Sequence, residues 1–383
     1  MLVYALATVV FLAGLISLGW DGYRTSLKIK GGTSLEAEKD PTKPGYEAQV
    51  KPIPTHLLIL TNDKGAATDA VVIAEGNAGK GGSVVVVPGV TIVEKPEGNQ
   101  NLSAYISAKG VGDGITEIQR IISFAVNDST TVTPKQWGEL LSPLGSLTVA
   151  NPSPLVRSTA PGQKEVVYAA GDVTLTPANI GDYVTFVSEG EAEINRADRV
   201  QAVFEAWLAA LTAKPSGVPT VAPFAAASGE EPVDVSALVT GLSQAAVAIR
   251  QLPTTAVPLP SANGTRVYLP DAEAIATMVP TVNPFPTSAF PGQRARTRIL
   301  NGTTDSAAAT RAAAPIVLAG GEITVLGNAP RFGIAATTVV YHDPSMKDAA
   351  TKIGTALGVT ATASPSQTEA YDVTVTLGSD FKG

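Results

Sequence analysis

The hydrophobic and polar positions divide the chain into one long apolar segment and two regions in which strand and helix patterns alternate. Residues 1–20 (MLVYALATVVFLAGLISLGW) contain no charged side chain. About twenty apolar residues are enough to cross a bilayer as a helix, so this pattern predicts a transmembrane anchor. The basic start and small-residue cleavage site of a signal peptide are missing. A cleaved signal peptide and a buried core helix are the alternatives.

The charges beside this anchor and the content of the domains that follow it predict opposite orientations in the membrane. Arg24, Lys28 and Lys30 follow the apolar segment, and the positive-inside rule taken alone would leave the rest of the chain in the cytoplasm. Basic residues upstream of Met1 would reverse that assignment. The domain content described below favours a cell-membrane protein with a single pass and with its soluble domains outside the cytoplasm.

A polar spacer at 21–54 precedes a first α/β domain that we expect at 55–281. Short β-branched runs bounded by Gly, Asp and Pro are typical of buried strands, whereas apolar residues three and four positions apart indicate helices. Since the two patterns alternate, an α/β fold follows. The predicted strands are 56–60, 70–74, 83–87 and 265–269, and the predicted helices are 114–124, 133–141 (Thr133 as N-cap), 197–211 and 235–250.

A Pro-rich linker at 282–294 leads to a second, smaller domain at 295–383. RTRIL, EITVLG, TTVVYH and DVTVTLG have strand patterns, and TATAS is a weaker candidate. Helical patterns occupy 306–318 and 345–357, with Ser345 as a candidate N-cap and Gly358 as a stop. The order is βαββαβ-like, that of a small split-βαβ domain.

The composition of the chain argues against several classes of binding and catalytic site. The net charge of −7 gives no field that would gather nucleic acid, so no nucleic-acid partner is expected. The chain has no cysteine, which excludes a disulfide framework and a thiolate zinc site. Its two histidines, His56 and His342, fall in different predicted domains. A Ser-His-Asp triad or a histidine metal cluster is therefore not expected.

Three short motifs have a structural interpretation, and one of them also has a functional interpretation. Gly110–Gly114 lacks the strand–loop–helix context of a phosphate loop and is interpreted as a plain loop. Gly79–Gly82 fits a hairpin turn between two strands. Arg294, Arg296 and Arg298 alternate along a strand, and they form either a solvated strand face or a small anion-binding patch.

Both domains resemble the LytR-CpsA-Psr family of envelope proteins. RTRILNGT, TVVYHDPSMKDAATKIGTALG and DVTVTLGSDF occur in the order expected of a LytR C-terminal domain. LLILTND, ATDAVVIA, VVVVPGVTIV, NLSAYISAKG, SPLGSLTV and NRADRVQAVFEAW resemble, more divergently, the family's catalytic domain. The resemblance implies wall-polymer transfer from a polyprenyl-pyrophosphate carrier, with Mg²⁺ and an arginine cluster at the pyrophosphate.

The resemblance carries four candidate site residues over to this chain. Asp63 and Asp69 match the family's acidic positions and are candidate metal ligands. Arg196 and Arg199 match the two arginines of the late helix and are candidate pyrophosphate ligands. Each of the four also has a structural interpretation, as a turn residue, a strand-end residue or the start of a solvated helix.

Other positions depart from the family pattern and mark a lost site. Ala67 stands where the family has the arginine of Arg-x-Asp, and Gly89 with Val90 replaces the Arg-Asp of a Pro-Arg-Asp-Thr turn. Glu189 and Glu191 fall where an Arg-x-Arg pair is usual. Replacing two positive by two negative charges changes the local charge by about four, and each close like-charge contact costs on the order of a few kcal/mol.

These departures favour a membrane-anchored, extracytoplasmic envelope protein that has lost the transferase chemistry and needs no cofactor. Such a protein would bind glycan, a lipid carrier or another envelope protein. One alternative is an active, divergent phosphotransferase that uses Mg²⁺ to attach polyprenyl-linked glycopolymer to the cell wall. The other is a structural accessory subunit of a membrane complex.

Overall fold

The computed structural model describes residues 38–227, 231–258, 266–364 and 370–382. The predicted anchor at 1–20 and most of the predicted spacer therefore lie outside the described residues. Within these ranges, no helix combines the length and the apolar character that crossing a membrane requires.

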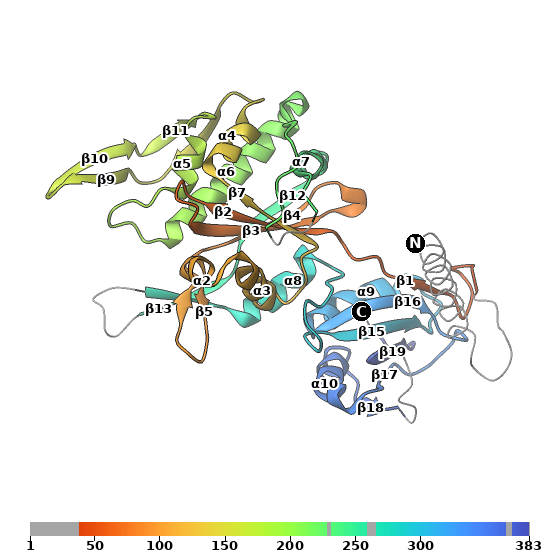
Figure 1. Ribbon diagram of the computed structural model, residues 1–383. Helices are drawn as coiled ribbons and strands as arrows, with labels where there is room; N and C mark the ends of the chain where they lie inside the picture. Colours follow the sequence, from red (N-terminus) through yellow and green to blue (C-terminus); the bar gives the residue numbers. More distant parts are fainter. Residues whose placement is uncertain (1–37, 228–230, 259–265, 365–369, 383) are drawn as a thin grey trace, which may run out of the picture.

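A five-stranded sheet forms the centre of the first domain, in the order β12-β4-β3-β2-β7 (Figure 1). β3 pairs antiparallel with both β2 and β4, whereas β7 is parallel to β2 and β12 is parallel to β4. The central strands are apolar on both faces because helices cover both. The strands are β2 (Thr55–Thr61), β3 (Ala67–Glu75), β4 (Gly82–Val87), β7 (Asp128–Val132) and β12 (Val247–Gln251).

Two layers of helices enclose this sheet in two separate apolar cores. One layer comprises α2 (Leu102–Lys109), α3 (Val111–Ile122) and α8 (Ala272–Val282). The other comprises α4 (Pro134–Leu141), α5 (Ile180–Thr185), α6 (Ile194–Ala213) and α7 (Val235–Ser243). The amphipathic pattern of 197–211 therefore predicted correctly a helix that lies on the sheet, and Thr133 caps α4 in a capping box with Gln136.

Four two-stranded ribbons extend from this body, and the β9–β10 ribbon protrudes furthest in Figure 1. They are β5 (Ile92–Val93) with β6 (Gln100–Asn101), β8 (Leu147–Asn151) with β11 (Gly171–Leu175), β9 (Leu155–Ala160) with β10 (Gln163–Tyr168), and β13 (Thr254–Pro258) with β14 (Arg266–Pro270). Short 3-10 turns occur at Asn77–Gly79, Pro215–Gly217 and Pro344–Met346.

The second domain is a six-stranded sheet in the order β1-β16-β15-β19-β17-β18. Five of its strands are β15 (Ala295–Asn301), β16 (Gly321–Asn328), β17 (Thr338–Tyr341), β18 (Ala361–Ala363) and β19 (Val373–Leu377), with helices α9 (Ala308–Leu318) and α10 (Lys347–Ala356). This is the predicted order with the weaker candidate strand included. The sixth strand, β1 (Glu47–Gln49), comes from the region predicted as a spacer and pairs antiparallel with β16.

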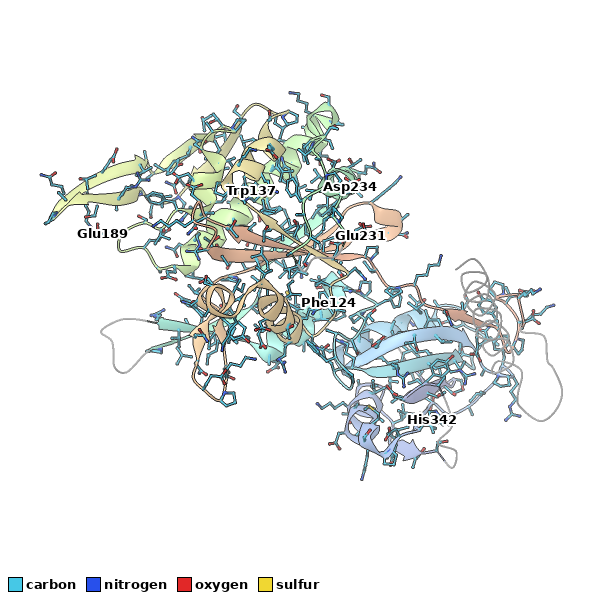
Figure 2. The ribbon with its side chains drawn as sticks, viewed as in Figure 1. Phe124, Trp137, Glu189, Glu231, Asp234 and His342 are labelled. Carbon is cyan, nitrogen blue, oxygen red and sulfur yellow. The ribbon has the colours of Figure 1, made fainter. Side chains whose placement is uncertain are left out.

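The two domains share one continuous apolar core, with Phe124 buried on the side that faces the second sheet (Figure 2). Arg294 connects them directly. Its Nε donates to the carbonyl oxygen of Ser123 at 2.9 Å, and its Nη1 donates to the carbonyl oxygens of Val317 and Gly321, each at 3.0 Å. The Pro-rich linker therefore packs between two bodies. Arg294 is buried, so neither interpretation of the arginine strand applies to it.

Three local predictions were wrong. The helix predicted at 235–250 ends at Ser243, because the following residues join β4 as β12. Gly110–Gly114 is not a plain loop: Gly110, at φ +99°, separates α2 from α3, which begins at the next residue. Ser345 is not the cap of α10. Its backbone N–H donates to the carboxylate of Asp343, and the helix begins two residues later. Gly358, at φ +74°, does follow the helix as predicted.

Candidate functional site

Asp69 and Arg196 meet in the interior, between the central sheet and α6. Arg196 Nε donates to Asp69 Oδ2 at 2.6 Å, and Arg196 Nη2 donates to the carbonyl oxygen of Thr68 at 2.8 Å. The other carboxylate oxygen of Asp69 accepts from the backbone N–H of Gly89 at 2.9 Å. The Asp69 side chain is 0% exposed and that of Arg196 is 6% exposed. This pair is satisfied within the protein.

Gly89 is held so closely against β3 that it cannot carry a side chain. A Cβ atom at this position would lie 1.7 Å from the carbonyl oxygen of Thr68, far inside van der Waals contact. The arginine that the family has here could not be restored without moving the backbone of β3. The glycine is therefore part of the packing that closes the pair between Asp69 and Arg196. Ala67, the other marker of loss, is half-buried at the start of β3.

Arg199, one turn further along α6, is also occupied. It forms an ion pair with Glu191, and its Nη2 donates to the carbonyl oxygen of Phe186 at 2.5 Å. Its guanidinium lies 5.9 Å from the centre of the Tyr183 ring, and its Nε is buried without a hydrogen-bond partner. Burial lowers the pKa of Arg199, although the charge of Glu191 opposes that shift. Glu191 thus supplies the negative charge that an external phosphate would otherwise provide.

Glu189 and Asp63 lie outside this buried cluster. Glu189 is exposed beside the β9–β10 ribbon (Figure 2), where its Oε1 is 3.4 Å from Lys164 Nζ. Asp63 is exposed in the turn between β2 and β3. Nowhere in the described ranges do three or more His, Cys, Asp or Glu side chains gather as a metal site would require. With Asp69 engaged by Arg196 and Gly89, the predicted pair of magnesium ligands does not fit a divalent ion.

Two hollows border the cluster and share Glu191 in their walls. The larger has a volume of about 650 Å³ and the smaller about 360 Å³. Amide, carboxylate, hydroxyl and guanidinium groups line the larger one, between the β5–β6 ribbon, the start of α6 and β14. These polar residues are Asn99, Gln100, Asn101, Glu191, Glu193, Arg266 and Tyr268. Most of these residues were not predicted as site residues, although the NQN run at 99–101 was a visible signal in the sequence.

Both histidines have structural partners, in different domains as predicted. His56, on β2, bridges two carboxylates: its Nδ1 is 2.8 Å from Asp128 Oδ1 and its Nε2 is 2.9 Å from Glu75 Oε1. Burial lowers the pKa of His56, but the hydrogen bonds and charges of these two carboxylates outweigh burial and raise it above 6.5. His342, after β17, lies 2.9 Å from the hydroxyl of Thr374.

Comparison with known proteins identifies the second domain. Residues 294–381 match the LytR_C family model, described as LytR cell envelope-related transcriptional attenuator. The C-terminal domain is a LytR_C domain. The match covers the sheet of β15–β19 with α9 and α10, and it confirms the resemblance seen in the sequence. No curated protein matches the chain.

Two solved structures also resemble part of this chain. TagV of Bacillus subtilis is 14% identical, with a TM-score of 0.43, over 61% of this chain and 96% of TagV. A LytR-Csp2A-Psr enzyme from Actinomyces oris is 18% identical, with a TM-score of 0.43, over 60% of this chain and 94% of that enzyme. These values are too low to carry an activity across.

Proposed function

We propose that this chain is a non-catalytic, extracytoplasmic protein of the cell envelope, anchored through residues 1–20, whose first domain binds a polar envelope ligand without transferring it. The LytR_C domain supports a role in the envelope. The apolar pattern of 1–20 supports the anchor. The first domain contributes the cleft next to Glu191, and the packed junction at Arg294 holds the two domains together.

The proposal depends on one observation: Asp69 and Arg196 form an ion pair with each other in the interior of the protein. To reach an external pyrophosphate, Arg196 would have to leave a carboxylate that is itself 0% exposed. Breaking a buried ion pair costs about 3–5 kcal/mol, because the remaining charge is left without a partner. Arg199 is likewise paired with Glu191. Both arginines carried over from the family therefore already have a carboxylate partner within the protein.

The chemistry of the larger cleft suits a ligand with many hydroxyl groups. Asn99 and Gln100 offer both donors and acceptors, and the carboxylates of Glu191 and Glu193 accept from hydroxyl or ammonium groups. Tyr268 adds an aromatic surface. A neutral or amino-bearing glycan matches these groups, whereas a pyrophosphate would face the carboxylate of Glu191.

Two ligands measured on the full chain in detergent test this proposal. Isothermal titration against soluble peptidoglycan fragments should show binding that is lost in Gln100→Ala or Tyr268→Ala. The same protein, incubated with a polyprenyl-pyrophosphate glycan and Mg²⁺, should release no lipid product. Glu189→Ala, outside the cleft, is the control for binding. Mg²⁺-dependent turnover that requires Arg196 would refute the proposal.

A further inference from the structure

The two edge strands of the central sheet, β7 and β12, differ in whether another segment covers them. At the β7 edge, the backbone N–H of Ala227 donates to the carbonyl oxygen of Ser129 at 2.7 Å. The hydroxyl of Thr130 donates to the carbonyl oxygen of Ala225, also at 2.7 Å. Residues 225–227 therefore cover the β7 edge of the sheet. β12, at the other edge, pairs with β4 on one side, and no strand of the described chain pairs with its other side.

The register of β12 identifies the backbone groups at its open side. Gly82 donates its N–H to the carbonyl oxygen of Ala246 at 3.2 Å, and Leu252 donates its N–H to the carbonyl oxygen of Val86 at 2.8 Å. Successive residues of a strand direct their N–H and C=O groups to opposite sides. The even-numbered residues of β12 therefore face β4, and Val247, Ile249 and Gln251 present theirs to the open edge.

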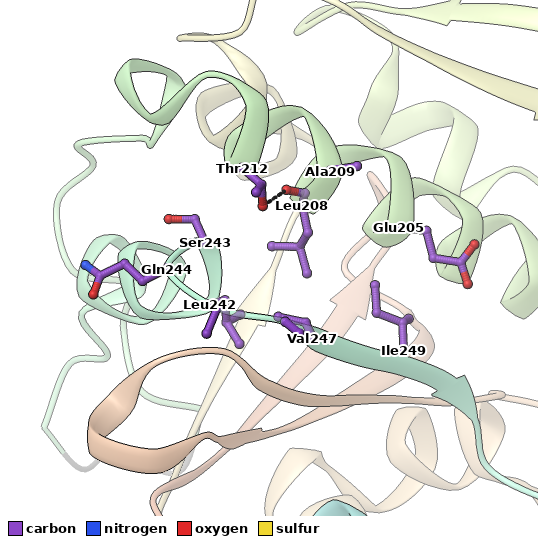
Figure 3. Close-up of a pocket in the computed structure, with 11 residues that line it drawn as sticks. Glu205, Leu208, Ala209, Thr212, Leu242, Ser243, Gln244, Val247 and Ile249 are labelled. Carbon is purple, nitrogen blue, oxygen red and sulfur yellow. Dashed lines mark hydrogen bonds between the residues drawn. The ribbon is translucent and has the colours of Figure 1, made fainter.

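A cleft of about 510 Å³ lies along this edge, between β12 and the second half of α6 (Figure 3). Leu208, Leu242, Val247 and Ile249 supply its apolar wall. The one charged side chain among the described residues that line it is Glu205. This carboxylate is exposed and accepts a hydrogen bond from Gln201 Nε2 at 2.8 Å. The cleft thus combines an open strand edge, an apolar wall and a negative rim.

We propose that the β12 edge is a docking site for an extended peptide segment of a partner protein. The segment would carry apolar side chains at alternate positions and a lysine or arginine on the same face. Added as a strand about 4.8 Å from β12, it would pair with the outward groups of Val247, Ile249 and Gln251. Its apolar side chains would enter the cleft beside Leu208, and its cation would meet Glu205.

The charge of the rim favours such a partner over a second copy of this chain. Two copies could pair their β12 strands around a two-fold axis at Ile249, because the outward backbone groups would match. That pairing would place α6 of both copies on the same side of the joined sheet. The exposed Glu205 of each copy would then approach Glu205 of the other, which is unfavourable.

The test uses two labelled heptapeptides, KTVTVTK and ETVTVTE, titrated against the full chain in detergent. We expect the basic peptide to bind at least about tenfold more tightly than the acidic one, which corresponds to about 1.4 kcal/mol. Glu205→Lys should reverse the preference. Ile249→Pro removes an N–H that faces the open edge and should weaken binding at least about tenfold, whereas Ile249→Val should keep it.

Amide hydrogen exchange gives an independent result if Ile249→Pro fails to fold. In the free protein, the amides of Val247, Ile249 and Gln251 should exchange faster than those of Ala248 and Arg250, and the basic peptide should slow only the first set. No binding of KTVTVTK at millimolar concentration would overturn the proposal. Protection of the outward amides that rises with protein concentration would also overturn it, in favour of a second copy.

Discussion

Arg196 and Asp69 are 127 positions apart in the chain, yet they form a 2.6 Å ion pair inside the first domain. Both side chains are buried, and the backbone of Thr68 and Gly89 adds one hydrogen bond to each of them. Residues that the family resemblance assigned to pyrophosphate and metal are thus joined to each other. We therefore expect the ion pair to contribute to the stability of the first domain.

Asp69→Ala should lower the free energy of unfolding by about 3–5 kcal/mol, because it leaves the Arg196 guanidinium buried without its partner. Arg196→Met should cost a similar amount. The double substitution should cost less than the sum, because no buried charge is then left unpaired. Urea unfolding of the four proteins gives the coupling energy, and single-variant costs below about 1 kcal/mol would show that the pair is dispensable.

Gly89→Ala should destabilise the protein by about 3 kcal/mol or more, because its Cβ would meet the Thr68 carbonyl oxygen at 1.7 Å. Gly112→Ala is the matched control. Gly112 lies in the first turn of α3 with no atom within 4 Å of its Cβ position, so alanine should be neutral or stabilise by about 0.5–1 kcal/mol. Equal effects at the two positions in thermal unfolding would contradict the packing argument.

The sequence predicted the elements that local pattern determines. The β-branched runs of β2, β3 and β4 and the cap at Thr133 are set by residues close in the chain. The C-terminal end of α7 was missed because 235–250 has few residues that break a helix, and only pairing with β4 makes its second half a strand. β1 was missed because three polar-flanked residues form a strand only against β16.

The residues of the candidate site could be named from the sequence, but the ion pairs that they form with one another could not. The family resemblance identified Glu191 and Arg199 as positions of interest, and the structure shows that their side chains form an ion pair with each other. The structural interpretation of Arg199 was the start of a solvated helix, whereas the structure buries this side chain and pairs it with Glu191 in the loop before α6. Pairing depends on the path of that loop, which no short-range pattern encodes.

Glu191→Ala should increase the affinity for inorganic pyrophosphate at least about tenfold at low ionic strength. The substitution removes a carboxylate from the cleft wall and leaves the Arg199 guanidinium without its counterion, so an external anion can replace it. Stability should fall at the same time and be partly restored by pyrophosphate. Calorimetric titration measures the affinity.

Glu193→Ala is the control for that experiment. Glu193 is an exposed residue of the larger cleft, which Glu191 also lines, so its loss changes the net charge equally but leaves Arg199 paired. If both variants gained the same affinity, general electrostatics rather than release of Arg199 would be responsible. If neither variant bound pyrophosphate more tightly, Glu191 would not be the group that blocks it.

His56 should make stability depend on pH. Its folded pKa is raised above 6.5 despite burial, because Asp128 and Glu75 favour the charged ring. A raised folded pKa contributes stability that is fully present below about pH 6.5 and is lost as the pH rises through the folded value. His56→Gln should remove this loss. Urea unfolding from about pH 5.5 to pH 9 checks it, and an unchanged pH profile in the variant would refute it.

Arg294→Met should uncouple the two domains. Burial lowers the pKa of Arg294 to about 10, so the guanidinium remains charged at neutral pH and donates to carbonyl oxygens of both domains. Removing it leaves the carbonyl oxygens of Ser123, Val317 and Gly321 without this donor, at about 1–3 kcal/mol for each buried oxygen that finds no other partner.

Calorimetry of the full chain should therefore show one unfolding transition in the native protein and two in Arg294→Met, with the LytR_C domain separating from the first domain. Arg311→Ala is the control, because its ion pair with Asp305 is exposed and contributes at most about 1 kcal/mol. If Arg294→Met kept a single transition at an unchanged temperature, the shared apolar core around Phe124 would be sufficient to hold the domains together, and the Arg294 contacts would add nothing to it.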